Sequence, residues 1–192
     1  MRITWAFFWL LTVLLAGCAL SPQEIEVSPK LTVPAAARNL SGTVRVSVID
    51  GRDSKTLGAR GGVYSDTNPI ITDQDFELSV RAAVELALRQ MGLVVTDAAE
   101  VPLVQVYIDK LTYQVPDGSY VTSVNLEAAT KIVVEANGQR FEGYYTSMLD
   151  EKVMKAPSDS HNTKLVNRTL SDVLGKALAD PGLRSFLEGL RD

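Results

Sequence analysis

The chain has 192 residues, a formal net charge of −4, one cysteine and one histidine. This length suits one domain with its own hydrophobic core. Acidic and basic residues are interspersed without a Lys/Arg block, which argues against a nucleic-acid partner because phosphate binding requires a clustered basic face.

The amino-terminal residues have the features of an export signal. Arg2 precedes an apolar run of about thirteen residues, which is within the length of a signal peptide and shorter than the roughly 20 residues of a membrane span. The run ends in Leu15-Ala16-Gly17-Cys18, which is similar to a bacterial lipobox. We therefore expect residues 1–17 to be a lipoprotein signal peptide. We expect Cys18 to carry a covalent diacylglycerol and an N-acyl chain, with no other cofactor.

The residue after the lipidated cysteine bears on location. Two or three acyl chains on Cys18 would hold the protein at a bilayer almost permanently. The residue after Cys18 is Ala19. By resemblance to lipoproteins of Gram-negative bacteria, an aspartate at this position would favour retention at the inner membrane, and its absence favours transfer to the outer membrane. This resemblance implies an outer-membrane lipoprotein that faces the periplasm. With Cys18 acylated, no second cysteine is left for an intramolecular disulfide.

The next segment contains Pro22, Pro29 and Pro34 and shows no helical or strand period. We expect residues 18–41 to be the lipidated amino terminus and a flexible tether, with a short extended piece near Leu31–Val33 that docks on the domain. The folded periplasmic domain is expected over residues 42–192.

The first half of this domain contains one strand and one helix with clear signals. Residues 43–49 alternate valine with polar residues and predict a strand, which ends in the turn-rich Asp50-Gly51-Arg52-Asp53. Residues 57–64 are glycine-rich and predict a loop and an irregular strand. Thr72 and Asp75 have the spacing of a capping box, and Gly92 ends the helix. One helical face gathers the apolar residues Phe76, Val80, Ala83, Val84, Ala87, Leu88 and Met91.

The second half predicts a meander followed by helices. After a short strand at 93–97, residues 103–115 alternate with a change of parity near Asp109-Lys110, which indicates a bulge. A long strand over 120–136 leads into Asn137-Gly138, the sequence signal of a two-residue hairpin. That hairpin would pair Val134 with Phe141, Thr130 with Tyr145 and Leu126 with Leu149. A helix from about Ser160 and a short one after Asp180-Pro181 complete the chain.

These elements predict the fold class. Two amphipathic helices over one face of a mostly antiparallel sheet give each apolar face a partner layer. We expect a two-layer α+β sandwich in which the meander is packed by the two helices.

Three features together carry a family resemblance: the lipobox, the segment Val46-Ser-Val-Ile-Asp-Gly-Arg52 followed by Leu57-Gly58, and a capped helix that ends in Met91-Gly92-Leu93. With them the chain resembles the YajG-like (Lipoprotein_16-like) family of uncharacterised proteobacterial lipoproteins over essentially its whole length. It is also similar to envelope proteins with a TolB-amino-terminal-like domain. The resemblance implies a fold and a location, and it supplies no reaction.

Residues with chemical potential are few. His161 lies beside Ser158, Asp159 and Ser160, which could suggest a Ser-His-Asp nucleophilic set. These residues are sequence neighbours at a helix start, however, where serine and aspartate are expected as caps. One imidazole and an acylated thiol cannot provide a zinc site. The glycines at 58–62 lack the Gly-Lys-Ser/Thr end of a phosphate loop. We therefore predict no catalytic residues, no metal site and no enzyme activity.

Two sets of residues remain as candidate contacts. Asp50, Arg52 and Asp53 follow a strand, where they can stabilise the turn or contact a partner. Five tyrosines of the meander region can form an aromatic recognition face or pack in the sheet; they are Tyr107, Tyr113, Tyr120, Tyr144 and Tyr145.

The leading hypothesis for function is a non-enzymatic, membrane-anchored interaction or accessory domain that binds another envelope protein or peptidoglycan. One alternative is a ligand-binding or enzymatic domain for peptidoglycan or lipid that uses Asp50, Asp53 and Asp117. Another is a homo-oligomeric component of an envelope assembly, although the sequence does not determine the oligomeric state.

Overall fold

The structure is a computed structural model, and it describes residues 22–60, 68–116, 122–154 and 157–190. The expected signal peptide, Cys18, Asp117 and Tyr120 lie outside the described residues.

The described elements follow the expected order, with two additions before the first expected strand. They are β1 (Gln23–Ile25), the 3-10 turn η1 (Ala35–Ala37), β2 (Thr43–Asp50), β3 (Thr56–Ala59), β4 (Pro69–Thr72), α2 (Phe76–Met91), β5 (Val94–Val95), β6 (Leu103–Gln114), β7 (Thr122–Ala136), β8 (Gln139–Val153), α3 (Asp159–Leu178) and α4 (Pro181–Glu188).

The strands form one mixed sheet. β6, β7 and β8 are the expected antiparallel meander, whereas β2 joins the other edge of β6 in parallel. Further along that edge β6 meets β3, where Gly58 lies opposite Tyr113. A Cβ on Gly58 would lie 1.8 Å from the carbonyl oxygen of Tyr113, so only glycine permits this approach. β4 bridges β3 and β1.

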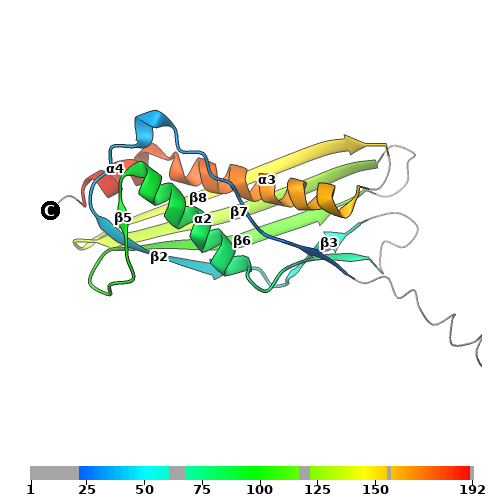
Figure 1. Cartoon of the computed structure of the whole chain (residues 1–192), viewed down its shortest axis with the longest axis horizontal. Coiled ribbons are helices and arrows are strands. Elements are labelled where there is room, and N and C mark those ends of the chain that lie inside the picture. Colours follow the sequence, from blue (N-terminus) through cyan, green and yellow to red (C-terminus); the bar gives the residue numbers. More distant parts are fainter. Residues whose placement is uncertain (1–21, 61–67, 117–121, 155–156, 191–192) are drawn as a thin grey trace, which may run out of the picture.

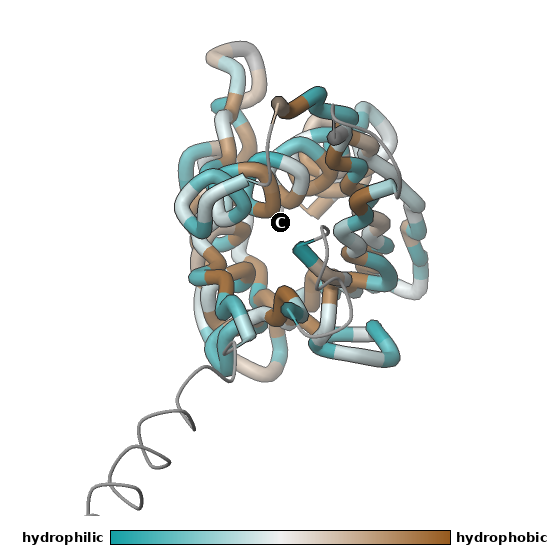
Figure 2. Tube along the Cα trace, turned by 90° about the vertical axis from the view of Figure 1, so that its right-hand side faces the viewer, coloured by the Kyte–Doolittle hydropathy of each residue, from teal (hydrophilic) through white to brown (hydrophobic). Residues whose placement is uncertain are grey.

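Helices and sheet form two layers around one core (Figures 1 and 2). α2 packs on β2, and α3 packs on β7 and β8. Alternate residues of β2, β6 and β7 face this layer and are buried, from Val44 on β2 to Ile132 on β7, whereas the inward residues of the edge strand β8 are mostly half-buried. The α+β sandwich predicted from the sequence is therefore the observed fold, with a sheet that contains more parallel pairing than expected.

The meander confirms the details that the sequence predicted. The pairs Val134–Phe141, Thr130–Tyr145 and Leu126–Leu149 lie opposite one another. Asn137 and Gly138 have φ of 53° and 73°, the left-handed conformation that a two-residue hairpin of this type requires. The register of β6 against β7 shifts between Ile108 and Lys110, which is the expected bulge.

The start of α2 differs from the sequence prediction. Thr72 is the last residue of β4 and is buried, and its hydroxyl accepts a hydrogen bond from Arg52. Asp75 is the N-cap, and its side chain makes no capping hydrogen bond. The predicted capping box is therefore wrong, because Thr72 belongs to β4 and the helix begins only at Phe76, with Asp75 as its N-cap.

The expected tether is largely part of the domain. β1 pairs in parallel with β4, and the following chain runs between α2 and α3 in the helix layer (Figure 1). Four apolar side chains of this segment are buried, namely Ile25, Val27, Val33 and Leu40. The backbone N–H groups of Ser28 and Lys30 donate to Asn167 and Ser171 of α3. The expected start of the domain at residue 42 is therefore too late. The prolines suggested a tether, but the segment is extended and is held by side chains of α3.

Candidate functional site

Asp50 and Arg52 form a closely paired loop at the end of β2. The Nε and Nη2 atoms of Arg52 each donate to one carboxylate oxygen of Asp50, both at 2.7 Å. The backbone N–H of Asp50 in turn donates to Glu77 at 2.7 Å, which ties the strand end to the first turn of α2. The pair therefore connects strand, loop and helix.

The guanidinium of Arg52 is enclosed. Its side chain is 4 % exposed, its Cζ lies 4.1 Å from the ring centroid of Phe76, and its Nη2 also donates to Thr72 at 3.1 Å. Partial burial alone would raise the pKa of Asp50, but the hydrogen bonds and charge of Arg52 outweigh it and hold the pKa below its ordinary value. Asp50 is consequently a carboxylate at neutral pH.

Asp53 lies with this pair on the wall of a pocket of about 360 Å³ between the loop and the start of α2. Asp73 and Glu77 line the same pocket, and the sequence analysis did not single them out. The signal available was a run of polar residues between β4 and the helix, which by itself is typical of any helix start. The structure thus brings Asp50, Arg52 and Asp53 into one pocket and adds two more carboxylates.

His161 does not form a Ser-His-Asp set. Ser158 is the N-cap of α3, and its side chain accepts from the backbone N–H of His161. The imidazole Nε2 lies 2.8 Å from a carboxylate oxygen of Glu151 on β8. Serine acts here as a helix cap, and the ring links the helix to the edge strand.

The side of the sheet that faces away from the helices carries a second group of notable residues. We call Tyr107, Lys131, Tyr144, Glu142 and Met148, on β6, β7 and β8, the outer sheet face. Tyr107, Lys131 and Tyr144 lie side by side on adjacent strands. The Lys131 ammonium is 4.3 Å from the ring centroid of Tyr107 and 6.0 Å from that of Tyr144. This places one cation between two aromatic rings on the surface.

The exposed part of the outer sheet face lies on β8. Tyr144 and Met148 are 69 % and 76 % exposed, unusually open for large apolar side chains. The hydroxyl of Tyr144 donates to Glu142, which raises the pKa of the phenol and, together with Arg140, lowers the pKa of the carboxyl. The face therefore combines aromatic, sulfur-containing and oppositely charged groups.

The other described tyrosines are not on this face. Tyr113 is buried against the helix layer, and its hydroxyl donates to Asn162 of α3 at 2.7 Å. Tyr145 is half-buried on the same inner side, and burial raises its pKa. Of the five tyrosines considered from the sequence, two form the surface pair and two are part of the packing.

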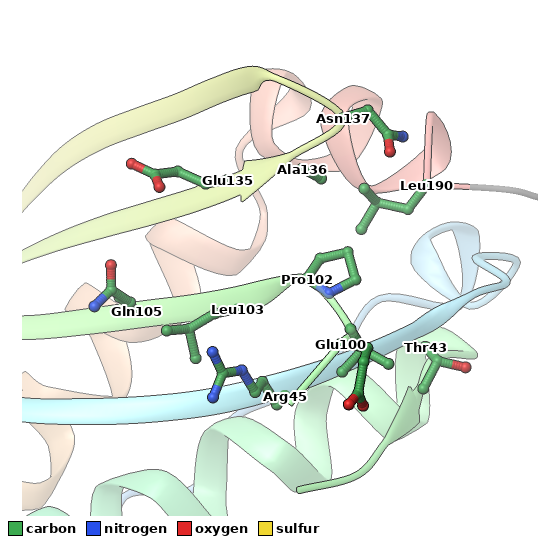
Figure 3. A pocket seen from close by; sticks show the side chains of 11 residues that line it. Thr43, Arg45, Glu100, Pro102, Leu103, Gln105, Glu135, Ala136, Asn137 and Leu190 are labelled. Carbon is green, nitrogen blue, oxygen red and sulfur yellow. The ribbon is translucent and has the colours of Figure 1, made fainter. Parts of the chain in front are cut away.

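A larger pocket, of about 500 Å³, lies where β2, β6 and the β7–β8 turn meet the carboxyl end of the chain (Figure 3). Arg45, Gln105, Glu135 and Leu190 are among its lining residues. The Nε of Arg45 is buried and has no hydrogen-bond partner among the described residues, but the side chain as a whole is only half-buried. This pocket contains no residue that the sequence analysis proposed.

In the ranges that the structure describes, no three His, Cys, Asp or Glu side chains are grouped so that they could hold a metal ion. None of the helices described there combines the length and hydrophobicity needed to cross a membrane.

A comparison with protein families matches residues 29–188 to a family described as uncharacterised lipoprotein (Lipoprotein_16). The chain belongs to this lipoprotein family. The match confirms the resemblance seen in the sequence, and it includes most of the segment between β1 and β2 that had been expected to be a tether.

A curated relative agrees with this assignment, and a solved structure shares the fold. The chain is 28 % identical to the uncharacterised lipoprotein YajG of Escherichia coli K12 over 179 residues, which are 91 % of each protein. A crystal structure of a DUF330-family protein from Xanthomonas campestris has a TM-score of 0.57 and 11 % identity, covering 88 % of this chain and 99 % of that one. This structure supports the fold alone. The names of these proteins state no reaction, so no catalytic residue is carried over to the lipoprotein described here.

Proposed function

We propose that this lipoprotein is anchored through Cys18 to the outer membrane, and that its periplasmic domain is a non-enzymatic module that binds another envelope protein. The observation that carries the proposal is the outer sheet face with its exposed Tyr144 and Met148. Aromatic residues and methionine are enriched in the centres of protein interfaces.

The chemistry of the outer sheet face favours a protein as its partner. Lys131 is flanked by Tyr107 and Tyr144, and Arg140 is paired with Glu135 and Glu142. Both signs of charge are therefore present, and a polyanion such as nucleic acid would meet the two carboxylates that are paired with Arg140. A protein surface with its own mixed charges can complement this pattern.

The short link to the anchor supports a role close to the bilayer. Five peptide steps separate Cys18 from Gln23, the first residue of β1. Whatever conformation they take, five steps of at most about 3.6 Å span no more than roughly 18 Å. A lipid on Cys18 would therefore keep the domain next to the membrane surface, so that its partner has to reach the same zone.

Site-specific photocrosslinking in intact cells tests the proposal. A photoreactive amino acid replaces Tyr144 or Met148 on the outer sheet face, and Asp172 on the exposed side of α3 serves as the control position. We expect a discrete crosslinked protein from the first two positions and none from the control. Crosslinks that contain only a second copy of this chain would instead support a homo-oligomer. The absence of any crosslink at Tyr144 and Met148 would contradict the proposal.

A further inference from the structure

The pocket under the amino-terminal end of α2 contains an arginine with a free donor. Two nitrogens of Arg52 are used by Asp50 and Thr72, and the guanidinium plane lies on Phe76. The third nitrogen, Nη1, is buried and has no hydrogen-bond partner among the described residues. A buried donor without a partner is unfavourable, more so when it is charged, so this atom favours the arrival of an acceptor.

A matching acceptor lies on the wall of the same pocket. Oδ2 of Asp73 accepts a hydrogen bond from the backbone N–H of Val27 at 3.0 Å. The other oxygen, Oδ1, is buried without a hydrogen-bond partner in the part of the chain that the structure describes. One contact orients the carboxylate, and the second oxygen is left for a donor. The residues that line the pocket thus include one unpaired donor and one unpaired acceptor, both covered by neighbouring atoms.

The charge of the pocket decides which ligand it suits. Four carboxylates line it, from Asp50, Asp53, Asp73 and Glu77, against two cations, Arg52 and Lys55. Because Arg52 and Asp50 neutralise each other, the remaining carboxylates exceed the remaining cation. A phosphate or carboxylate ligand would be repelled, whereas an ammonium group would be attracted. The acceptor that reaches Arg52 should accordingly be uncharged.

We propose that this pocket binds the free amino end of a short peptide. The ammonium group donates to Oδ1 of Asp73, and the first peptide carbonyl accepts from Nη1 of Arg52. These two groups are adjacent in every peptide, and the carbonyl is neutral. The ethanolamine headgroup of a lipid also has an ammonium group, but it would bring a phosphate into the acidic pocket. The site lies at the helix layer and is separate from the outer sheet face.

Calorimetry on the full lipidated chain in detergent micelles tests the site with alanyl-alanine amide as the probe. N-acetylated alanyl-alanine amide lacks the charged amine, and phosphoethanolamine has the amine with a phosphate. We expect binding of the first probe only. Binding of phosphoethanolamine alone would assign the pocket to a lipid headgroup, and equal binding of the acetylated probe would remove the role of the ammonium; either result overturns the proposal.

Variants locate the binding. Asp73→Asn keeps an oxygen that can accept from Val27 but removes the charge, and Asp172→Asn makes the same change on the exposed side of α3. Because a hydrogen bond to a charged group is worth about 1.5 to 3 kcal/mol, we expect Asp73→Asn to weaken binding about tenfold or more, and the control to have no effect.

An unchanged affinity in Asp73→Asn would overturn the proposal. The absence of any binding by the native chain would also overturn it, and ordered water would then be the hydrogen-bond partner of Arg52 and Asp73. If Asp73→Asn does not fold, which circular dichroism would show, the acetylated probe on the native chain still tests the requirement for an amine. Crosslinking at Tyr144 in the Asp73→Asn background separates a failure at this pocket from a failure of the proposed interaction face.

Discussion

Replacing Asn162 by alanine should destabilise the domain strongly, because this side chain connects three parts of the fold. Asn162 is fully buried on α3; its Oδ1 accepts from Tyr113 on β6 at 2.7 Å, and its Nδ2 donates to Gln23 on β1 at 2.8 Å. Gln23 also donates to the carbonyl oxygen of Asp159 at 2.9 Å. The chain of hydrogen bonds fixes β1 to the helix layer and the sheet.

The size of the effect follows from the groups that lose their partners. Asn162→Ala leaves the hydroxyl of Tyr113 and the side-chain oxygen of Gln23 buried and unpaired. Each such group costs about 1 to 3 kcal/mol, so we expect a loss of roughly 2 to 6 kcal/mol in the free energy of unfolding. Burial raises the pKa of Tyr113 to about 12, so its hydroxyl remains a donor over the whole useful pH range.

Urea denaturation of the unlipidated chain from Ala19 onward measures this loss. With a slope of about 2 kcal/mol per molar urea, the transition midpoint should fall by roughly 1 to 3 M. Tyr113→Phe is the partner variant, and its cost should be smaller in the Asn162→Ala background than in the native chain. A loss below about 0.5 kcal/mol for Asn162→Ala, or an equal cost of Tyr113→Phe in both backgrounds, would refute the reasoning.

Three further predictions concern glycine, the ion pair and the anchor. Gly138→Ala should lower the free energy of unfolding by about 1 kcal/mol, because only its φ of 73° disfavours a side chain. Gly92→Ala should lower it more, because its Cβ would also lie 2.3 Å from the backbone oxygen of Leu40. Thermal unfolding of both variants tests this order. Because the pKa of Asp50 is lowered in the folded protein, its ion pair stabilises the fold fully at pH values above the ordinary pKa of 3.8. This stabilisation is lost as the pH falls through the lower pKa of the folded state. The stability difference between the native chain and Asp50→Asn should therefore shrink on acidification, and a constant difference would exclude the pair as its cause. Cys18→Ser should abolish metabolic labelling with palmitate, and unchanged labelling would rule out lipidation at this residue.

The sequence predicted the hairpin register, the bulge in β6 and the buried face of α2, because each depends on residues that are close together in the chain. The Asn137-Gly138 turn set the register of two long strands, because one residue of slip would move Val134 to the wrong face. The change of parity near Asp109 located the bulge for the same reason. The stripe of buried residues on α2 also followed from spacing alone.

Contacts between distant segments could not be predicted in this way. Residues 23–30 alternate between buried and exposed positions, but the sequence could not show that side chains of Asn167 and Ser171 accept the backbone hydrogen bonds of Ser28 and Lys30. The contact between Asp73 and Val27 arises from the parallel pairing of β4 and β1, which brings the N–H of Val27 to the carboxylate. The sequence located Asp50 and Arg52 but gave no sign of the partners around them.

Hydrogen–deuterium exchange tests most directly the claim that the folded domain begins at β1 and not at residue 42. It is measured on the full lipidated chain by mass spectrometry of peptides from residues 22–40. The N–H groups of Val27, Ser28, Lys30 and Leu40 are all hydrogen-bonded to other parts of the domain. We predict that these peptides exchange nearly as slowly as those of β7, because the segment opens only when the domain unfolds. Exchange at the rate of an unstructured peptide would show a free tether and would contradict both the short link to the membrane and the pocket at Asp73.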